Sequence, residues 1–182
     1  LPLPQTMLNF RFEKFGGILA SDKPPFLAYL NKWFVRLLGY GKDPIWQTSE
    51  ADDLLSAPTE VHFSITNACP LSCTHCYINE SQHGKNTLDI DTIKSWLDIF
   101  SNKAPQTNLI VLGGEPTLHK DLSVVIHHAK LLKFKSITID TNGYLFHDIL
   151  DKITPKEIDF LSFSLDGATG NTNDAIRGKG SY

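Results

Sequence analysis

The sequence predicts an α/β fold built from parallel βα units, and three observations support this prediction. From Glu60 onward, short apolar runs that fit buried strands alternate with segments of helical periodicity. Four such runs each lead into a loop of small and polar residues. All three cysteines of the chain lie in the first of these loops. Because four strands do not close a barrel of ordinary size, we expect a partial (βα) barrel that lacks its C-terminal strands.

Residues 1–58 are predicted to form a small separate element and a linker. Leu8, Phe10 and Phe12 alternate with polar residues, and Gly16-Gly17 favours a turn into a second strand at 18–20. A helix is then expected from Ser21 or Asp22 to about Gly39, with an apolar face packed in a core. That face consists of Phe26, Leu27, Leu30, Trp33, Phe34, Leu37 and Leu38. The element is therefore a β-hairpin followed by a helix, and residues 41–58 are the linker.

Residues 59–182 carry the βα units. Strands are expected at 61–65, 109–112, 136–140 and 160–165, and helices at 89–100, 121–132 and 146–153. In parallel α/β folds, active sites assemble at the carboxyl ends of the strands. The polar loops after these strands are therefore the expected location of the functional site.

The composition excludes several classes of protein. The 182 residues include 17 Lys and Arg against 20 Asp and Glu, a formal net charge of −3. This balance does not favour broad binding to nucleic acid or to an anionic membrane. No apolar run is long enough to span a membrane, and the first residues do not resemble a secretory signal. We therefore expect neither nucleic acid nor membrane as a partner.

The loop with the cysteines predicts a metal centre. Cys69, Cys73 and Cys76 lie within eight residues, and an odd, clustered set is a poor disulfide framework. Thiolates suit both zinc and iron–sulfur clusters. In a zinc site, His75 or a distant histidine would complete the ligands. In a [4Fe–4S] cluster, the fourth iron would stay open, and the spacing alone leaves both alternatives standing.

Four motifs in order resemble the radical S-adenosylmethionine enzymes. The C-x3-C-x2-C loop follows the first strand, G-G-E-P the second, T-N-G the third and S-L-D-G the fourth. The resemblance covers residues 60–182. The final R-G-K-G-S-Y is similar to the segment that members with a C-terminal SPASM domain have at this point. The chain is thus identified as a C-terminally truncated member, of SPASM type.

The resemblance implies a role for each motif. Cys69, Cys73 and Cys76 would ligate three irons of a [4Fe–4S] cluster, and S-adenosylmethionine would chelate the open iron. Gly113, Gly114 and Glu115 would receive the methionine amino group, since glycines let backbone acceptors come close. The remaining candidates for cofactor contacts are His75 and Tyr77 near the adenine, Ser164 and Asp166 near the ribose or carboxylate, and Arg177 at the carboxylate. Asn142 is interpreted mainly as a turn former.

The implied activity is reductive cleavage of S-adenosylmethionine to a 5′-deoxyadenosyl radical, which abstracts a hydrogen atom from substrate. No side chain is assigned as catalytic. An oxygen-sensitive cluster with reduced cysteines favours the cytoplasm, and an external low-potential donor of the flavodoxin or ferredoxin type would supply the electron. The fragment alone is expected to be inactive.

Three hypotheses for the function follow. The SPASM-like ending and the N-terminal element favour maturation of a peptide or protein, with the N-terminal element as a remnant of a peptide-recognition domain. The second hypothesis is small-molecule cofactor biosynthesis, as in relatives acting on molybdopterin or haem precursors. The third is a non-catalytic zinc-binding module.

Overall fold

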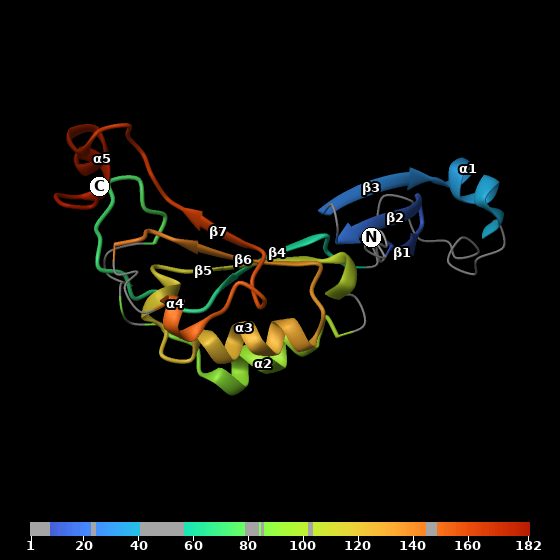
Figure 1. Cartoon of the computed structure of the whole chain (residues 1–182), viewed down its shortest axis with the longest axis horizontal. Helices are drawn as coiled ribbons and strands as arrows, with labels where there is room; N and C mark the ends of the chain where they lie inside the picture. The colour runs from blue at the N-terminus through green and yellow to red at the C-terminus, as the bar shows by residue number, and fades with distance from the viewer. Residues whose placement is uncertain are drawn as a thin grey trace, which may run out of the picture.

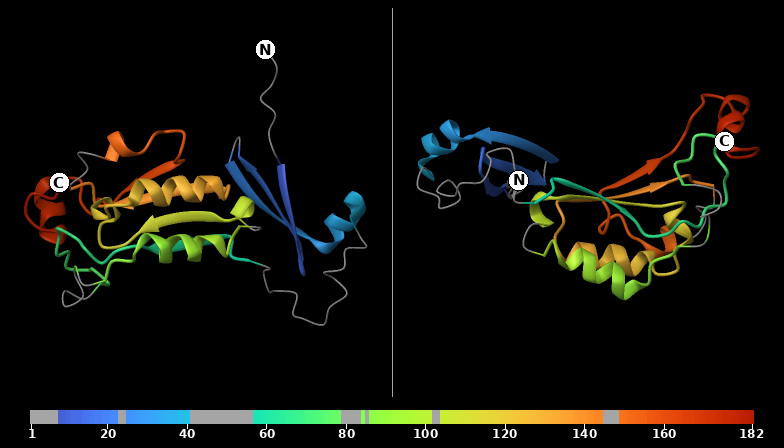
Figure 2. Two further views of the ribbon diagram at one scale, coloured as in Figure 1. Left: turned by 90° about the horizontal axis from the view of Figure 1, so that it is seen from below. Right: turned by 180° about the vertical axis from the view of Figure 1, so that it is seen from behind.

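Two β-sheets dominate the computed structural model (Figure 1). The structure describes residues 8–22, 25–40, 57–78, 84, 86–101, 104–144 and 149–182. Most of the expected linker, 41–56, and the start of the helix expected at 146–153 lie outside these residues. The two sheets lie at opposite ends of an elongated chain (Figures 1 and 2).

The larger sheet has four parallel strands in sequence order, β4-β5-β6-β7. They are β4 (Glu60–Ser64), β5 (Asn108–Leu112), β6 (Ser136–Thr141) and β7 (Phe160–Phe163). The parallel pairing places Ser64 beside Leu112, and Thr141 beside Phe163, so the four strand ends form one edge. The predicted partial βα barrel is confirmed.

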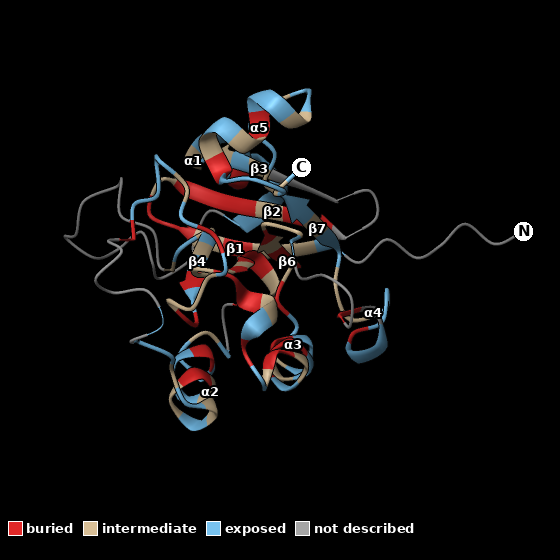
Figure 3. Cartoon of the chain, turned by 90° about the vertical axis from the view of Figure 1, so that its left-hand side faces the viewer, coloured by how far each residue is buried: buried red, intermediate tan, exposed pale blue. Residues whose placement is uncertain are grey.

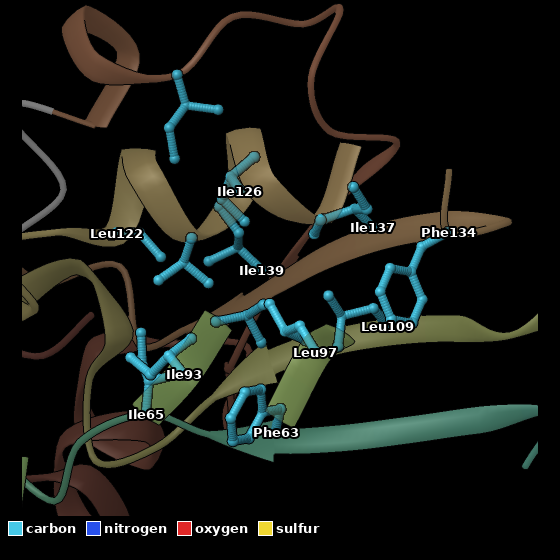
Figure 4. Packing of buried hydrophobic residues seen from close by; sticks show 14 of the residues in the cluster. Phe63, Ile65, Ile93, Leu97, Leu109, Leu122, Ile126, Phe134, Ile137 and Ile139 are labelled. Atoms are coloured by element: carbon cyan, nitrogen blue, oxygen red, sulfur yellow. The ribbon is translucent and has the colours of Figure 1, made fainter. Parts of the chain in front are cut away.

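Helices cover one face of this sheet: α2 (Ile90–Asp98), α3 (Leu122–Leu131) and α4 (Ile149–Lys152) (Figure 1). The Asp89 carboxylate caps α2 by accepting the Thr92 N–H at 2.9 Å. The core lies between these helices and the strands (Figure 4). Its fully buried members come from both layers and include Ile93, Leu109, Val111, Val125, Ile126, Ile137 and Ile139.

The N-terminal sheet differs from the expected hairpin and helix. It has three antiparallel strands, β1 (Leu8–Glu13), β2 (Gly16–Asp22) and β3 (Pro25–Asn31), and only then a short helix, α1 (Lys32–Val35), and a π-helical turn, η1 (Arg36–Tyr40). The prediction of a helix over 25–31 was therefore wrong. Seven residue pairs join β3 to β2, from Gly16 with Asn31 to Asp22 with Pro25. Short apolar runs fit either period, and this backbone pairing decides for the strand.

The apolar stripe expected to be buried is largely exposed in its described part. Trp33 is 70% exposed and Leu37 is 68% exposed. Instead, the centre of the sheet is buried: Ile18 and Ala20 of β2 are fully covered, and β2 is the largely buried strand in Figure 3. On β1, Arg11 and Glu13 form a buried ion pair at 2.6 Å.

The N-terminal sheet adjoins the amino ends of the barrel strands. The Arg11 guanidinium donates to the Ala57 carbonyl at 2.7 Å, just before β4, and the Tyr29 hydroxyl lies 3.3 Å from Thr59 Oγ1. The carboxyl ends of the strands, with α5 (Gly170–Arg177) and the cysteine loop, lie at the other end of the sheet (Figures 1 and 2).

Candidate functional site

One hollow of about 220 Å³ opens at the carboxyl edge of the barrel sheet. The loops after β4, β5, β6 and β7 all contribute to its wall. Most of the predicted site residues line it: Cys69, Cys73, His75, Cys76, Tyr77, Gly113, Gly114, Ser164 and Arg177. Sequence reasoning missed Leu71, Leu112, Asp140 and Thr141 and gave Asn142 mainly a turn role, although all five also line the hollow. Their position in or beside the motif loops was the available signal.

The three thiols are free and lie at different depths. Cys69 and Cys73 are half-buried and Cys76 is exposed. Burial is the main cause that raises the pKa of the Cys69 thiol, and the nearby charges of Glu115 and Cys73 act in the same direction. Burial also raises the pKa of Cys73, against the opposing effect of Arg177. Binding a metal centre would therefore release protons from these thiols.

The glycine pair after β5 lets two loops touch. Gly114 N–H donates to the Thr66 carbonyl and Glu115 N–H donates to the Ala68 carbonyl, each at 2.7 Å. A Cβ atom on Gly113 would lie 2.3 Å from the Thr66 oxygen, and one on Gly114 would lie 2.5 Å from the Ala68 oxygen. Glycine is thus required at both positions for this approach. The cysteine loop starts from this contact.

Glu115 lies behind the hollow rather than in its wall. Its side chain is 0% exposed. One carboxylate oxygen accepts the Thr117 N–H at 3.0 Å and the Thr117 and Thr141 hydroxyls at 2.7 Å each. The other oxygen accepts the Asn142 N–H at 2.8 Å. The carboxylate therefore joins the loops after β5 and β6.

The C-terminal end of α5 holds the middle of the cysteine loop. Thr74 N–H donates to the Ile176 carbonyl at 2.9 Å, and the Cys73 thiol lies 3.9 Å from the Arg177 carbonyl. The buried Arg177 guanidinium pairs with Asp166, and His75 Nε2 lies 3.6 Å from the same carboxylate. Asp166 and Arg177, both predicted to contact the cofactor, thus contact each other here. Asp166 does not line the hollow.

The donor set fits an iron–sulfur cluster, because three cysteine thiols line one shared hollow. Among the described residues, no three His, Cys, Asp or Glu side chains are gathered closely enough to hold one metal ion. A cluster presents a separate iron to each thiolate, and the three thiols line one shared hollow beside a glycine-rich loop. The residues present therefore suit a multi-iron cluster with space beside it.

The described fold is a partial βα barrel with a three-cysteine loop at the carboxyl ends of its strands. Comparison with family models identifies the class of enzyme that has this arrangement. The model of the radical SAM superfamily matches residues 63–182. The chain belongs to this superfamily. Enzymes of this superfamily use a [4Fe–4S] cluster and S-adenosylmethionine. Membership therefore favours an enzyme over the hypothesis of a non-catalytic zinc-binding module.

The curated relatives include a bacteriocin biosynthesis protein, a mycofactocin maturase and a probable cyclase. The antilisterial bacteriocin subtilosin biosynthesis protein AlbA of Bacillus subtilis is 29% identical over 138 residues, which are 74% of this chain and 30% of AlbA. The mycofactocin maturase MftC of Mycolicibacterium smegmatis is 29% identical over 70% of this chain and 32% of its own. A probable GTP 3′,8-cyclase of Sulfolobus acidocaldarius is 29% identical over 58% of this chain and 34% of its own. The chain thus spans about a third of the length of these relatives.

Solved structures show the same fold. The crystal structure of Streptococcus suis SuiB bound to S-adenosylmethionine superposes with a TM-score of 0.67 at 21% identity, over 96% of this chain and 50% of SuiB. SuiB bound to its precursor peptide SuiA gives a TM-score of 0.66 at 20% identity. Because the match covers 96% of this chain, it extends into the N-terminal sheet as well as the barrel.

Among the described residues, no helix has the length and apolar character needed to cross a membrane.

Proposed function

We propose that this chain binds a [4Fe–4S] cluster through Cys69, Cys73 and Cys76 and binds S-adenosylmethionine beside it. The observation that carries this proposal is the convergence of the three thiols and the Gly113-Gly114 loop on one hollow. A bound [4Fe–4S] cluster would supply the low-potential electron, and bound S-adenosylmethionine would supply the 5′-deoxyadenosyl group for hydrogen abstraction, with methionine as the other product. The protein's own part is to bind, orient and shield these groups.

Individual side chains receive roles from their places around the hollow. The backbone of Gly113 and Gly114 is the proposed acceptor for the methionine amino group, with Glu115 fixing that loop from behind. Arg177 is proposed for the cofactor carboxylate, which requires it to share or leave Asp166. The other proposed contacts are His75 and Tyr77 with the adenine, and Ser164 and Asp166 with the ribose or carboxylate.

The proposed substrate is a peptide or protein. Two relatives are named as a bacteriocin biosynthesis protein and a maturase, and SuiB was solved with a precursor peptide. We assign residues 1–58 to peptide recognition, with β1 and β3 as the outer strands of a sheet that a peptide can extend. This sheet lies at the amino end of β4, which is five residues long. At about 3.3 Å per residue, a captured peptide needs roughly five or more extended residues to reach the hollow.

Small-molecule cofactor biosynthesis is the second candidate. It is favoured by the probable GTP 3′,8-cyclase and by the Fe-coproporphyrin III synthase of Methanosarcina barkeri, which is 30% identical over 67% of this chain. Under either candidate, the proposal includes an external low-potential electron donor of the flavodoxin or ferredoxin type and a cytoplasmic location.

Cluster binding is tested by removing one thiol from the full-length protein. Cys73→Ala, reconstituted anaerobically, should lose the cluster absorbance and most of its iron, because the remaining two thiolates cannot hold three irons. Ser72→Ala is the matched control, since it removes one oxygen from an exposed residue of the same loop. An unchanged cluster spectrum in Cys73→Ala would refute the assignment.

Peptide recognition is tested by deleting residues 8–39 from the full-length enzyme. The candidate peptide is a short precursor encoded beside the gene. Recognition predicts much weaker peptide binding with iron content and peptide-independent cleavage of S-adenosylmethionine preserved. Unchanged peptide affinity excludes the role, and loss of the cluster on deletion would make the N-terminal sheet a structural support instead.

A further inference from the structure

We propose that Asn142 tunes the reduction potential of the cluster by donating a hydrogen bond to the Cys69 sulfur. The inference rests on the proposed cluster. It assigns a role to Asn142 of the T-N-G motif, which the sequence alone indicates only as a turn former. Asn142 Nδ2 lies 3.6 Å from Cys69 Sγ, within hydrogen-bonding range for sulfur. Asn142 touches a proposed ligand of the cluster, so it is a positioning residue for that cluster and not a catalytic one.

The orientation of the Asn142 amide follows from its other partners. Its Oδ1 accepts the Tyr144 N–H at 2.8 Å, so the amide oxygen is directed at the backbone. The NH₂ group must then point the other way, toward Cys69. The amide therefore donates to the sulfur, because a flipped amide would direct its NH₂ group at the Tyr144 N–H.

The backbone of the loop is held as firmly as the side chain. Asn142 N–H donates to the buried Glu115 carboxylate at 2.8 Å. The next residue, Gly143, has a φ of +70°, a conformation that side chains disfavour, and its N–H donates to Thr141 Oγ1 at 3.1 Å. Thr141 in turn donates to Glu115 at 2.7 Å. The donor position is thus fixed by the fully buried Glu115 rather than by solvent.

The expected effect on the cluster has a definite sign. A hydrogen bond to a ligating sulfur stabilises negative charge there, and the reduced cluster carries one more negative charge than the oxidised one. Asn142 therefore favours the reduced form and raises the midpoint potential. Its loss should make the cluster harder to reduce.

The test is a redox titration of the full-length protein, reconstituted anaerobically and followed by electron paramagnetic resonance without S-adenosylmethionine. Asn142→Asp keeps the oxygen that accepts from Tyr144 but removes the donor, and Asn142→Ala removes the donor without adding charge. Both variants should titrate at a lower midpoint potential than the parent, with equal iron content. Asn108→Asp is the matched control, because it makes the same change at the far end of the sheet, where Asn108 Oδ1 accepts the Ser136 hydroxyl at 2.9 Å. The midpoint potential of this variant should equal that of the parent.

The outcomes separate this inference from the proposed function. A parent protein that binds no cluster refutes the proposed function, and the inference with it. A parent with a cluster and an unchanged potential in Asn142→Ala overturns the inference alone, even if the potential of Asn142→Asp shifts, because that shift would then reflect the added charge. Loss of iron from both variants would give Asn142 a role in cluster assembly and also overturn tuning.

Discussion

Glu115 holds two loops of the candidate site together, a role that its place in the G-G-E-P motif does not indicate. The resemblance placed it among the acceptors for the methionine amino group. In the structure, both of its carboxylate oxygens are already occupied by donors from the loops after β5 and β6. Burial removes the water that would hydrate the carboxylate, and these four hydrogen bonds replace it. Its contribution to cofactor binding is therefore expected to run through the position of the Gly113-Gly114 backbone.

Replacing Glu115 by glutamine should destabilise the protein. One carboxylate oxygen would become an NH₂ group, and either the Asn142 N–H or the Thr117 and Thr141 donors would then face another donor. The cost expected for such a buried mismatch is about 1–3 kcal/mol in the free energy of unfolding, measured by urea denaturation. The affinity for S-adenosylmethionine should fall in parallel.

The control for this change is Glu60→Gln, because the half-exposed Glu60 side chain contacts His62 at 2.7 Å and lies far from the loops that Glu115 joins. Its effect should stay within about 0.5 kcal/mol. Equal stability of Glu115→Gln and the parent would show that the carboxylate does not hold the loops.

At the scale of elements, α5 connects the end of the described chain to the cysteine loop. Its first turn is held by a capping box between Thr169 and Thr172, and its last carbonyls contact Thr74 and Cys73. After the helix, the Asp174 carboxylate accepts the N–H groups of Gly180, Ser181 and Tyr182 at 2.6–3.1 Å. The segment that follows α5 is thus folded back onto the helix by one carboxylate.

This fold-back should depend on pH. The Gly180 N–H is the main cause that lowers the pKa of Asp174 below its ordinary value of 3.8, and Ser181 and Tyr182 add to it. Because the folded pKa is the lower one, the stabilisation is complete above the unfolded value and is lost as the pH falls through the folded value. Hydrogen-exchange protection factors of residues 180–182 should therefore hold from pH 7 to about 4 and decrease below it.

Asp174→Asn should remove that pH step and lower the protection already at neutral pH. Asp151→Asn, on the exposed first turn of α4, changes the same charge elsewhere and should leave the step intact. A step of equal size in Asp174→Asn would assign the pH dependence to another group.

For the molecule as a whole, β7 is an outer strand of the described barrel sheet and carries exposed apolar side chains. Within the described residues, β7 pairs only with β6, and Phe160 and Phe163 are 51% and 55% exposed. An outer strand with exposed apolar side chains favours association with another chain. The buried core, by contrast, lies on the helix-covered face of the sheet (Figure 4).

The 182-residue chain, produced by itself, should therefore self-associate with rising concentration. Phe160→Lys should weaken this association, because it adds a charge to the edge strand, and sedimentation velocity over a range of concentrations measures the change. Ile99→Lys is the control, since Ile99 is 75% exposed at the end of α2, away from the β7 edge. Equal weakening by both substitutions would show that general apolar exposure, not the edge, drives association.

The order of motifs along the chain was sufficient to predict the parallel sheet and the end of its strands at which the cysteine loop and the hollow lie. It was sufficient because strand periodicity and loop residues are local properties, and parallel strands bring their carboxyl ends to one edge. The same local reasoning failed at 25–31, where a short apolar run fits a helix as well as a strand and pairing with β2 decides the outcome.

Only the tertiary structure decided which polar side chains are already used by the protein. Glu115 meets Thr141, 26 residues away, and the Cys73 thiol meets the Arg177 carbonyl, 104 residues away. The sequence predicts only a turn at Asn142. In the structure its amide donates to the Cys69 sulfur, because the loops after two different strands converge there. Hydrogen bonding requires atoms to lie within a few ångströms at a defined angle, and no spacing along the chain specifies that across separate βα units.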